Sequence, residues 1–232
     1  DVYKRQFREY GWMSAMVVDN KGRLIGVINI DDVVEIVHEE TNEDMMLLTG
    51  AESNDVYRSV FSIFKSRSIW LVTNLFATIV AASVVGEFQD IIAQLSILAV
   101  LMPIVASMGG TTGQQTLAVV VRSLATKELN SRNALRMIGK EFMVGLCNGL
   151  LFAVMIGIAV RIWFPGQEMI SYIIALAMLC NLTVASLAGI LIPLTINRLK
   201  IDPAIASGVF LIACTDSGGY FIFLGLAKLL LF

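Results

Sequence analysis

A single carboxylate stands in the final apolar stretch of the chain. Asp216 is the only acidic or basic side chain between Pro203 and Ala227, and it lies near the middle of that stretch. A carboxylate at bilayer depth costs roughly 3 kcal/mol on insertion scales, so it persists where a polar group or a cation meets it. Asp216 therefore predicts a cation or proton site.

A second group of acidic residues lies near the start of the chain. The stretch 32–44 holds six acids with no Lys or Arg between them, and on a helix Glu35, Glu39 and Glu43 would share one face. Like charges four residues apart destabilise a helix by a few tenths of a kcal/mol per pair. Such a face gains from a bound cation, and hard divalent cations prefer carboxylate oxygens. A solvated acidic face is the alternative interpretation.

The composition places most of this chain in a membrane. Hydrophobic residues make up 56% and charged residues 16% of the 232 residues, and the mean hydropathy is +0.75. Soluble domains carry about 25% charged residues. Residues 1–67 hold twelve of the nineteen acids and eight of the seventeen Lys and Arg. A boundary near Arg67 therefore separates a polar segment from a membrane domain.

Five long segments carry few or no charges, and each meets or nearly meets the roughly 20 apolar residues that a helix needs to cross a bilayer. They predict five transmembrane helices, at about 69–86, 91–121, 137–163, 169–197 and 203–230. The second segment is longer than one crossing requires. Pro103 and the glycines at 109, 110 and 113 predict a break within it.

The Lys and Arg residues indicate an orientation. They gather before the first segment, between the second and third, and between the fourth and fifth, whereas only Arg161 and Lys228 lie at the other ends. Positive residues mark the cytoplasmic side of a membrane protein. We therefore predict a multi-pass protein of the cell membrane with a cytoplasmic N-terminus and an extracytoplasmic C-terminus.

The polar segment reads as α/β. Ala15–Asp19 and Leu24–Asn29 have the composition of strands, and Asn20-Lys21-Gly22 suits the turn of a hairpin. Asp32 resembles a helix N-cap, with Glu35 as the return partner of a capping box. Two strands and one helix cannot bury a sufficient core alone. We expect them to be the end of a larger domain or to dock on another part, and we interpret residues 1–6 as a sequence artefact.

Two membrane motifs resemble those of the MgtE family of magnesium transporters and channels. MGGTTGQQTLAVVVRSLA follows Pro103 at Met108–Ala125, and DPAIASGVFLIACTDSGGYFIFLGLA closes the chain at Asp202–Ala227, with Asn181 and Pro193 between them. The stretch Val17–Ala51 is similar to the end of that family's second CBS domain and the start of its connecting, or plug, helix. The resemblance also implies that the family's N-terminal helical domain and first CBS domain are absent.

This resemblance implies a mainly α protein. A five-helix transmembrane domain (68–232) would follow a partial α/β CBS segment (7–50) and a long connecting helix (51–67). The family is one of magnesium-selective channels or transporters that work as homodimers and import Mg²⁺ down its electrochemical gradient. The acids that match its cytosolic Mg²⁺ sites, where the bound ion would hold the pore closed, are Asp32, Glu40, Glu43 and Asp44.

By the same resemblance Asp216 would lie in the selectivity site of the pore, paired with its copy in the second subunit. Mg²⁺ sheds water reluctantly and is held by one or two carboxylates with several waters retained, which two aspartates can supply. Thr111 departs from the Asn of the family's GGN-type motif, so we assign no direct polar role there. The expected pore-lining residues are Gly109, Gly110, Gly113, Asn181, Ala213 and Ser217. For the three glycines the alternative is close helix packing, and for Asn181 the favoured alternative is a hydrogen bond to a neighbouring helix.

Other classes of protein fit less well. A proton-coupled secondary transporter of divalent cations is the alternative, but it would need further intramembrane charges, and no second acid lies near the centre of a span. An intramembrane aspartyl protease needs two aspartates in one subunit. No Walker-type phosphate loop is present. We expect no enzymatic activity and no nucleic-acid partner, while discrimination among Mg²⁺, Co²⁺, Ni²⁺, Mn²⁺ and Ca²⁺ stays open.

Overall fold

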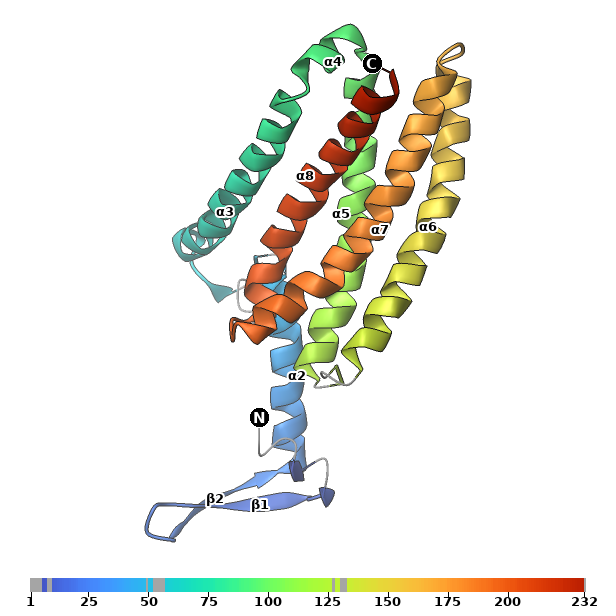
Figure 1. Cartoon of the computed structure of the whole chain (residues 1–232). Helices are drawn as coiled ribbons and strands as arrows, with labels where there is room; N and C mark the ends of the chain where they lie inside the picture. Colours follow the sequence, from blue (N-terminus) through green and yellow to red (C-terminus); the bar gives the residue numbers. More distant parts are fainter. Residues whose placement is uncertain are drawn as a thin grey trace.

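The computed structural model describes residues 6–7, 10–48, 50–51, 57–126, 128–129 and 133–231, apart from the side chains of residues 40, 41 and 44. A β-hairpin leads into a helix, α2, that projects from one end of a helical bundle (Figure 1). Among the described residues, five helices are long and apolar enough to cross a membrane, which confirms the predicted mainly α architecture. They are α3 (Val60–Gly86), α5 (Ile97–Ala125), α6 (Ala134–Trp163), α7 (Glu168–Arg198) and α8 (Pro203–Leu231).

The predicted hairpin is confirmed. Strands β1 (Ser14–Val18) and β2 (Leu24–Asn29) pair antiparallel. The Asp19 carboxylate closes the turn by accepting hydrogen bonds from the backbone N–H groups of Lys21 and Arg23, each at 2.8 Å. Gly22 takes a φ of +77°, which glycine adopts without steric cost. The two strands form the whole sheet in the described part of the chain.

Helix α2 (Ile30–Leu47) begins earlier than the sequence predicts. The helix follows β2 directly, so Asn29 occupies the N-cap position and Asp32 is the third residue of the helix. The Asp32 carboxylate accepts a 2.9 Å hydrogen bond from the backbone N–H of Asn29. Asp32 is therefore the return partner of the cap, not the N-cap. At the other end Gly50 has a φ of +73°, and the N–H groups of Gly50 and Ala51 bond back to the carbonyls of Leu47 and Met46. These two bonds form the Schellman motif that commonly ends a helix.

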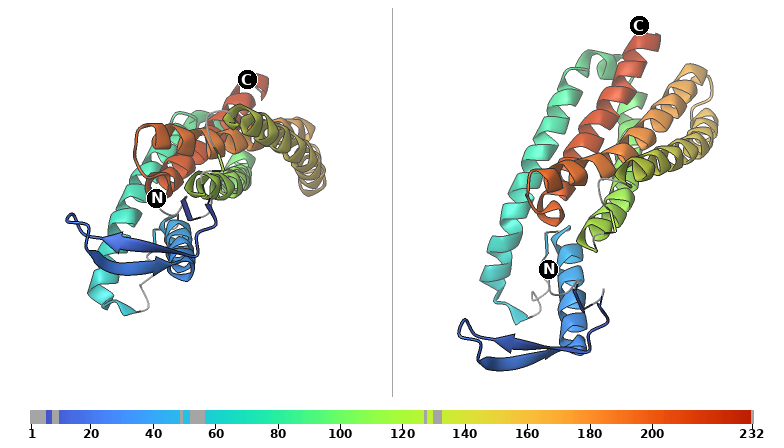
Figure 2. Two further views of the ribbon diagram at one scale, coloured as in Figure 1. Left: turned by 90° about the horizontal axis from the view of Figure 1, so that it is seen from below. Right: turned by 60° about the horizontal axis from the view of Figure 1, so that its bottom comes forward.

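The bundle is organised around α7 and α8. Helix α8 contacts α3, α5 and α7, while α7 contacts α5, α6 and α8, as Figures 1 and 2 show. Leu98 and Leu101 of α5, Ile173 of α7 and Phe223 of α8 are 0% exposed. Lipid tails are as apolar as leucine, so close packing rather than the hydrophobic effect holds such a core together.

The second predicted span differs from expectation. Helix α5 runs without interruption through Pro103 and all three glycines, so the predicted break there is wrong. The interruption lies at residues 95–96, between the short helix α4 (Gln89–Gln94) and α5. Neighbouring side chains cover two of the glycines, as described below, and Pro103 removes only one hydrogen bond near the start of the helix. The surrounding helices stabilise the regular conformation.

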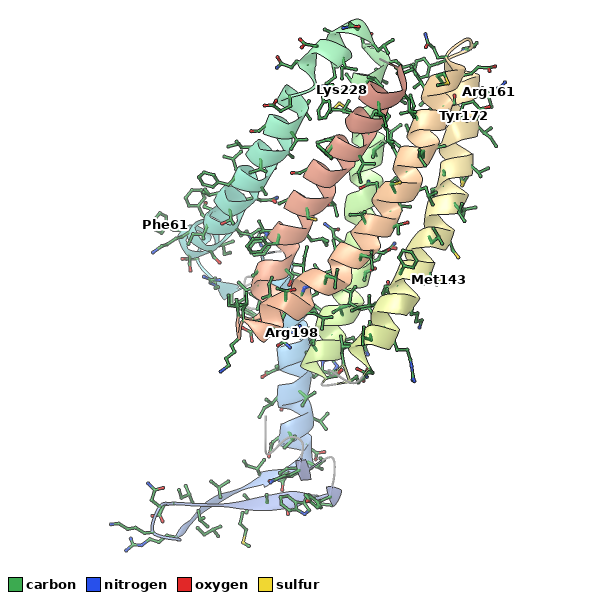
Figure 3. All side chains as sticks on the ribbon, in the orientation of Figure 1. Phe61, Met143, Arg161, Tyr172, Arg198 and Lys228 are labelled. Carbon is green, nitrogen blue, oxygen red and sulfur yellow. The ribbon has the colours of Figure 1, made fainter. Side chains whose placement is uncertain are left out.

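The first span also begins earlier than predicted. Helix α3 starts at Val60, where the Ser59 hydroxyl accepts a hydrogen bond from the N–H of Ser62 at 3.4 Å. Residues 60–67 of the expected connecting helix are therefore continuous with this span, and residues 52–56 of that expected helix lie outside the described residues. In Figure 3, Arg198 lies at the end of the bundle from which α2 projects, and Arg161 and Lys228 lie at the opposite end. The cytoplasmic orientation of the N-terminus stays a prediction.

Candidate ion-conducting site

Asp216 lies near the middle of α8. Ala213, Asp216 and Ser217 are spaced by three and four residues, so they share one face of that helix. Within the described part of the chain, the Asp216 carboxylate is half-buried and has no hydrogen-bond or ion-pair partner. The Ser217 hydroxyl is buried and has no partner among the same residues. One chain alone therefore leaves the polar groups of this face unsatisfied.

Asn181 of α7 connects the three central helices. Its side chain is 1% exposed, and its Nδ2 donates a 2.7 Å hydrogen bond to the carbonyl of Val105 on α5. A Cβ added to Gly109 would lie 2.5 Å from that Nδ2, and a Cβ added to Gly219 would lie 3.2 Å from it. Asn181 is thus held between a glycine of α5 and a glycine of α8. It packs against the turn of α8 that follows Asp216.

The remaining pore candidates lie where α5 meets α8. A Cβ on Gly113 would lie 2.9 Å from the Leu211 side chain, so this glycine permits close packing of the two helices. Gly110 is more open, because its added Cβ would meet only the Thr215 hydroxyl, at 4.0 Å. The structure brings Gly109 and Asn181 together in the interior of the subunit. Ala213 and Ser217 lie with Asp216 on the half-buried face of α8.

The predicted regulatory acids are distributed along α2. Asp32 and Glu43 are exposed, and the side chains of Glu40 and Asp44 lie outside the described residues. Twelve residues separate Asp32 from Asp44, which corresponds to about 18 Å along a helix. One ion in one chain cannot bridge that distance. Among the described residues, no three Asp, Glu, His or Cys side chains converge on a shared metal position.

The end of α2 packs against the helices that carry the candidate site. Leu47 and Leu48 lie against a buried cluster that includes Leu117 of α5 and Leu211 of α8. A Cβ on Gly208 of α8 would lie 3.1 Å from the carbonyl of Leu48. A displacement of α2 would therefore act on α8 at Gly208, which lies about two helical turns before Asp216 in the chain.

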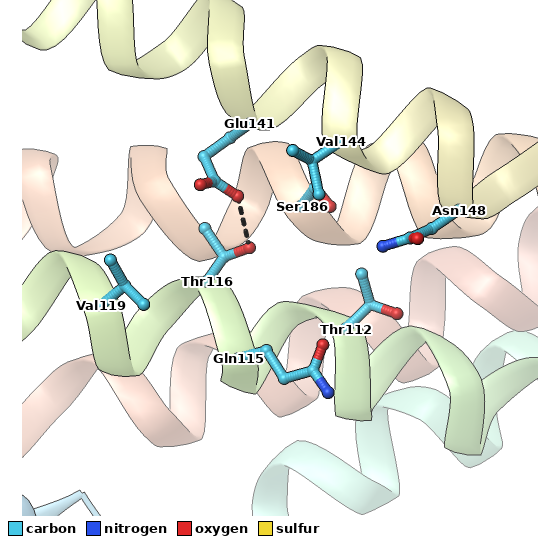
Figure 4. A pocket seen from close by; sticks show the side chains of 8 residues that line it. All are labelled: Thr112, Gln115, Thr116, Val119, Glu141, Val144, Asn148 and Ser186. Carbon is cyan, nitrogen blue, oxygen red and sulfur yellow. Dashed lines mark hydrogen bonds between the residues drawn. The ribbon is translucent and has the colours of Figure 1, made fainter.

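Sequence reasoning missed one acid inside a span. The charge-free run starts at Phe142, so Glu141 was not counted among intramembrane charges, yet α6 begins at Ala134 and places Glu141 two turns inside the helix. The Thr116 hydroxyl of α5 donates a 2.9 Å hydrogen bond to Glu141 Oε2 (Figure 4). Glu141 could have been recognised from the sequence as an acid inside a span, because residue 141 falls within the helix predicted at 137–163.

Among the described residues, the five long apolar helices define a multi-pass membrane protein, with one unpaired carboxylate in the middle of α8. Residues 102–226 match the MgtE family, whose members are divalent cation transporters. This match covers more than half of the chain, and the chain belongs to that family. The family is one of transporters, not enzymes.

Three relatives are similar over nearly the whole chain. The magnesium transporter MgtE of Enterococcus faecalis is 33% identical over 222 residues, 96% of this chain and 49% of the relative. The magnesium transporter MgtE of Bacillus subtilis is 30% identical over 224 residues, 96% and 49% respectively. That of Thermus thermophilus is 29% identical over 231 residues, 98% and 51%. The chain thus spans about half the length of the curated relatives it matches.

Proposed function

We propose that this chain forms the membrane part of a homodimeric Mg²⁺ channel, with Asp216 from each subunit at the selectivity site. The observation that carries this proposal is the Asp216 carboxylate, which lies near the middle of α8 without a hydrogen-bond or ion-pair partner in the described part of its own chain. A buried charge needs compensation. A divalent cation shared with a second copy of the same face would supply it.

The chemistry suits a hydrated ion. Mg²⁺ keeps several of its waters and takes one or two carboxylates, and the Ser217 hydroxyl lies one residue from Asp216 to hydrogen-bond those waters. Weak binding through water also allows release, which conduction requires. A membrane potential of 100 mV is worth about 2.3 kcal/mol per charge, hence about 4.6 kcal/mol for a divalent cation. Inward movement of Mg²⁺ therefore needs no coupled proton.

The dimer arrangement can be tested directly. If the face of α8 that carries Asp216 lies on a two-fold axis, Ala213→Cys in a background without other cysteines should crosslink to its copy under mild oxidation. Leu151→Cys, on an exposed position of α6, is the control and should not crosslink. Crosslinking of the control but not of Ala213→Cys would refute this arrangement.

The acidic helix would supply the regulation. Cytosolic Mg²⁺ bound by Glu40, Glu43 and Asp44 would lower their mutual repulsion and hold α2 in place, while Asp32 would serve a separate position. The packing of Leu47 and Leu48 against α5 and α8 provides the mechanical link to the pore. Glu43→Gln should therefore raise the internal Mg²⁺ concentration at which flux is half inhibited.

The decisive experiment is Mg²⁺ uptake into liposomes that contain the purified chain and a Mg²⁺-sensitive dye. Asp216→Asn and Asp216→Ala should abolish uptake, whereas Glu168→Gln, an exposed charge at the end of the bundle, should leave it intact. Normal uptake by both Asp216 variants would disprove the proposal. Uptake that follows a pH gradient instead of the membrane potential would favour a proton-coupled transporter.

A further inference from the structure

A pocket lies between α5, α6 and α7 (Figure 4), on a different face of α5 from the one that meets α8. It has a volume of about 160 Å³, and its polar lining consists of Thr112, Gln115, Thr116, Glu141, Asn148 and Ser186. We propose that this pocket is a second cation site, which binds a hydrated divalent cation outside the pore. The choice of a divalent cation rests on the proposed function.

The spacing of small and polar residues builds the pocket. Thr112, Gln115 and Thr116 share one face of α5, and Glu141 and Asn148, seven residues apart, share one face of α6. A Cβ on Gly145 of α6 would lie 2.8 Å from the Ser186 Oγ of α7. Glycine at that position lets α6 approach α7 closely, so polar groups from three helices meet in one place.

An unsatisfied hydroxyl points to an occupant. Ser186 is 1% exposed and lines the pocket, and its Oγ has no hydrogen-bond partner among the described residues. Buried polar groups are nearly always paired with protein or with ordered water. At about 30 Å³ for each water, the pocket has room for about five water molecules or for an ion with most of its shell.

The charge of the pocket selects a cation. Glu141 is the only charged side chain among the lining residues, and no described Lys or Arg lies within ion-pair distance of it. Thr116 donates to one of its oxygens, Oε2, and thereby orients the carboxylate. One carboxylate with several retained waters is a usual arrangement for Mg²⁺, and the surrounding hydroxyl and amide groups can hydrogen-bond those waters.

An adjoining groove offers a route to the pocket. It has a volume of about 350 Å³, shares Val119 and Glu141 with the pocket, and reaches Glu128 and Asn133 at the loop between α5 and α6. Two basic residues of α6, Arg136 and Lys140, also line it. Helix α5 separates this route from α8, because Gly113 of α5 faces Leu211 of α8 while Thr116 bonds to α6. The second site is therefore distinct from Asp216.

A fluorine label on Cys147 reports on this site. Cys147 is exposed on α6, adjacent to Asn148, and it can be labelled alone after Cys180→Ala and Cys214→Ala. Asp216→Asn is added to remove the proposed pore site, and Mn²⁺ serves as the paramagnetic probe. We expect Mn²⁺ to broaden the ¹⁹F signal of the detergent-solubilised protein, and Glu141→Gln to raise the Mn²⁺ concentration for half-broadening at least tenfold.

Glu87→Gln, an exposed acid next to α3, is the matched control and should leave the titration unchanged. Ser186→Ala should weaken Mn²⁺ binding without lowering the thermal midpoint, because the hydroxyl has no hydrogen-bond partner among the described residues. Equal titrations for Glu141→Gln and its parent, or no broadening of the parent, would overturn the proposal. The outcome is independent of uptake by Asp216→Asn, so failure of the pore proposal is recognised separately.

Discussion

The contact between Gly109 and Asn181 leads to a quantitative prediction. In Gly109→Ala the new Cβ would lie 2.5 Å from Asn181 Nδ2 and 3.1 Å from its Cγ, so the asparagine must move. Overpacking of this kind costs about 1–3 kcal/mol. Loss of the Asn181 hydrogen bond to Val105 costs about 1 kcal/mol more.

The helix itself offsets part of this cost. Alanine is favoured over glycine inside a helix by about 1 kcal/mol, so the net destabilisation should be about 1–3 kcal/mol. For a chain of this size that corresponds to a fall of roughly 2–12 °C in the thermal midpoint. Tryptophan fluorescence of the purified protein in detergent during a heating scan measures the shift.

Gly110→Ala provides the matched control in the next position of the same helix. Its new Cβ would meet only Thr215 Oγ1, at 4.0 Å, so we expect no loss of stability and a gain of up to about 1 kcal/mol. If Gly109→Ala proves as stable as Gly110→Ala, the inferred packing of Asn181 between α5 and α8 is wrong.

Three further predictions concern the ends of helices. Asp202→Ala should destabilise the protein by about 0.5–2 kcal/mol, seen as a lower thermal midpoint, because Asp202 Oδ1 accepts a 2.8 Å hydrogen bond from the N–H of Ala204 at the start of α8. Lys200→Gly should raise that midpoint. Lys200 follows the end of α7 with a φ of 61°, a conformation that costs a non-glycine residue about 1 kcal/mol. A lower midpoint would contradict this prediction. Glu168→Gln should change the stability by less than about 1 kcal/mol, because its 2.7 Å ion pair with Arg161 is more than half exposed.

Much of the fold could be predicted from local patterns. The five spans follow from hydropathy, because a helix in lipid must satisfy its backbone internally and needs a minimum length of apolar residues. The start of α8 at Pro203 matches the span predicted at about 203–230, and the hairpin follows from the turn at Asn20-Lys21-Gly22. Each of these features depends on residues that are close in the sequence.

The predictions that were wrong concern features that depend on residues far apart in the sequence or on where one element meets the next. The glycines of α5 predicted a break, yet Asn181 and Leu211 pack against Gly109 and Gly113 and the helix continues. Asp32 was assigned as an N-cap because no local signal shows that β2 runs directly into α2. Glu141 was omitted because only the charge-free run that begins at Phe142 was treated as lying within the membrane, and Glu141 immediately precedes that run.

The sequence by itself determined that this protein has five segments long and apolar enough to cross a membrane and that Asp216 is a lone carboxylate within the last of them. Hydrophobic length and the rarity of charges in lipid suffice for both conclusions. Only the tertiary structure decided that Asn181 packs between two glycines and that Glu141 meets Thr116 beside the Ser186 hydroxyl. Those contacts depend on how each helix is rotated against its neighbours, and that rotation results from the packing of many side chains far apart in the sequence.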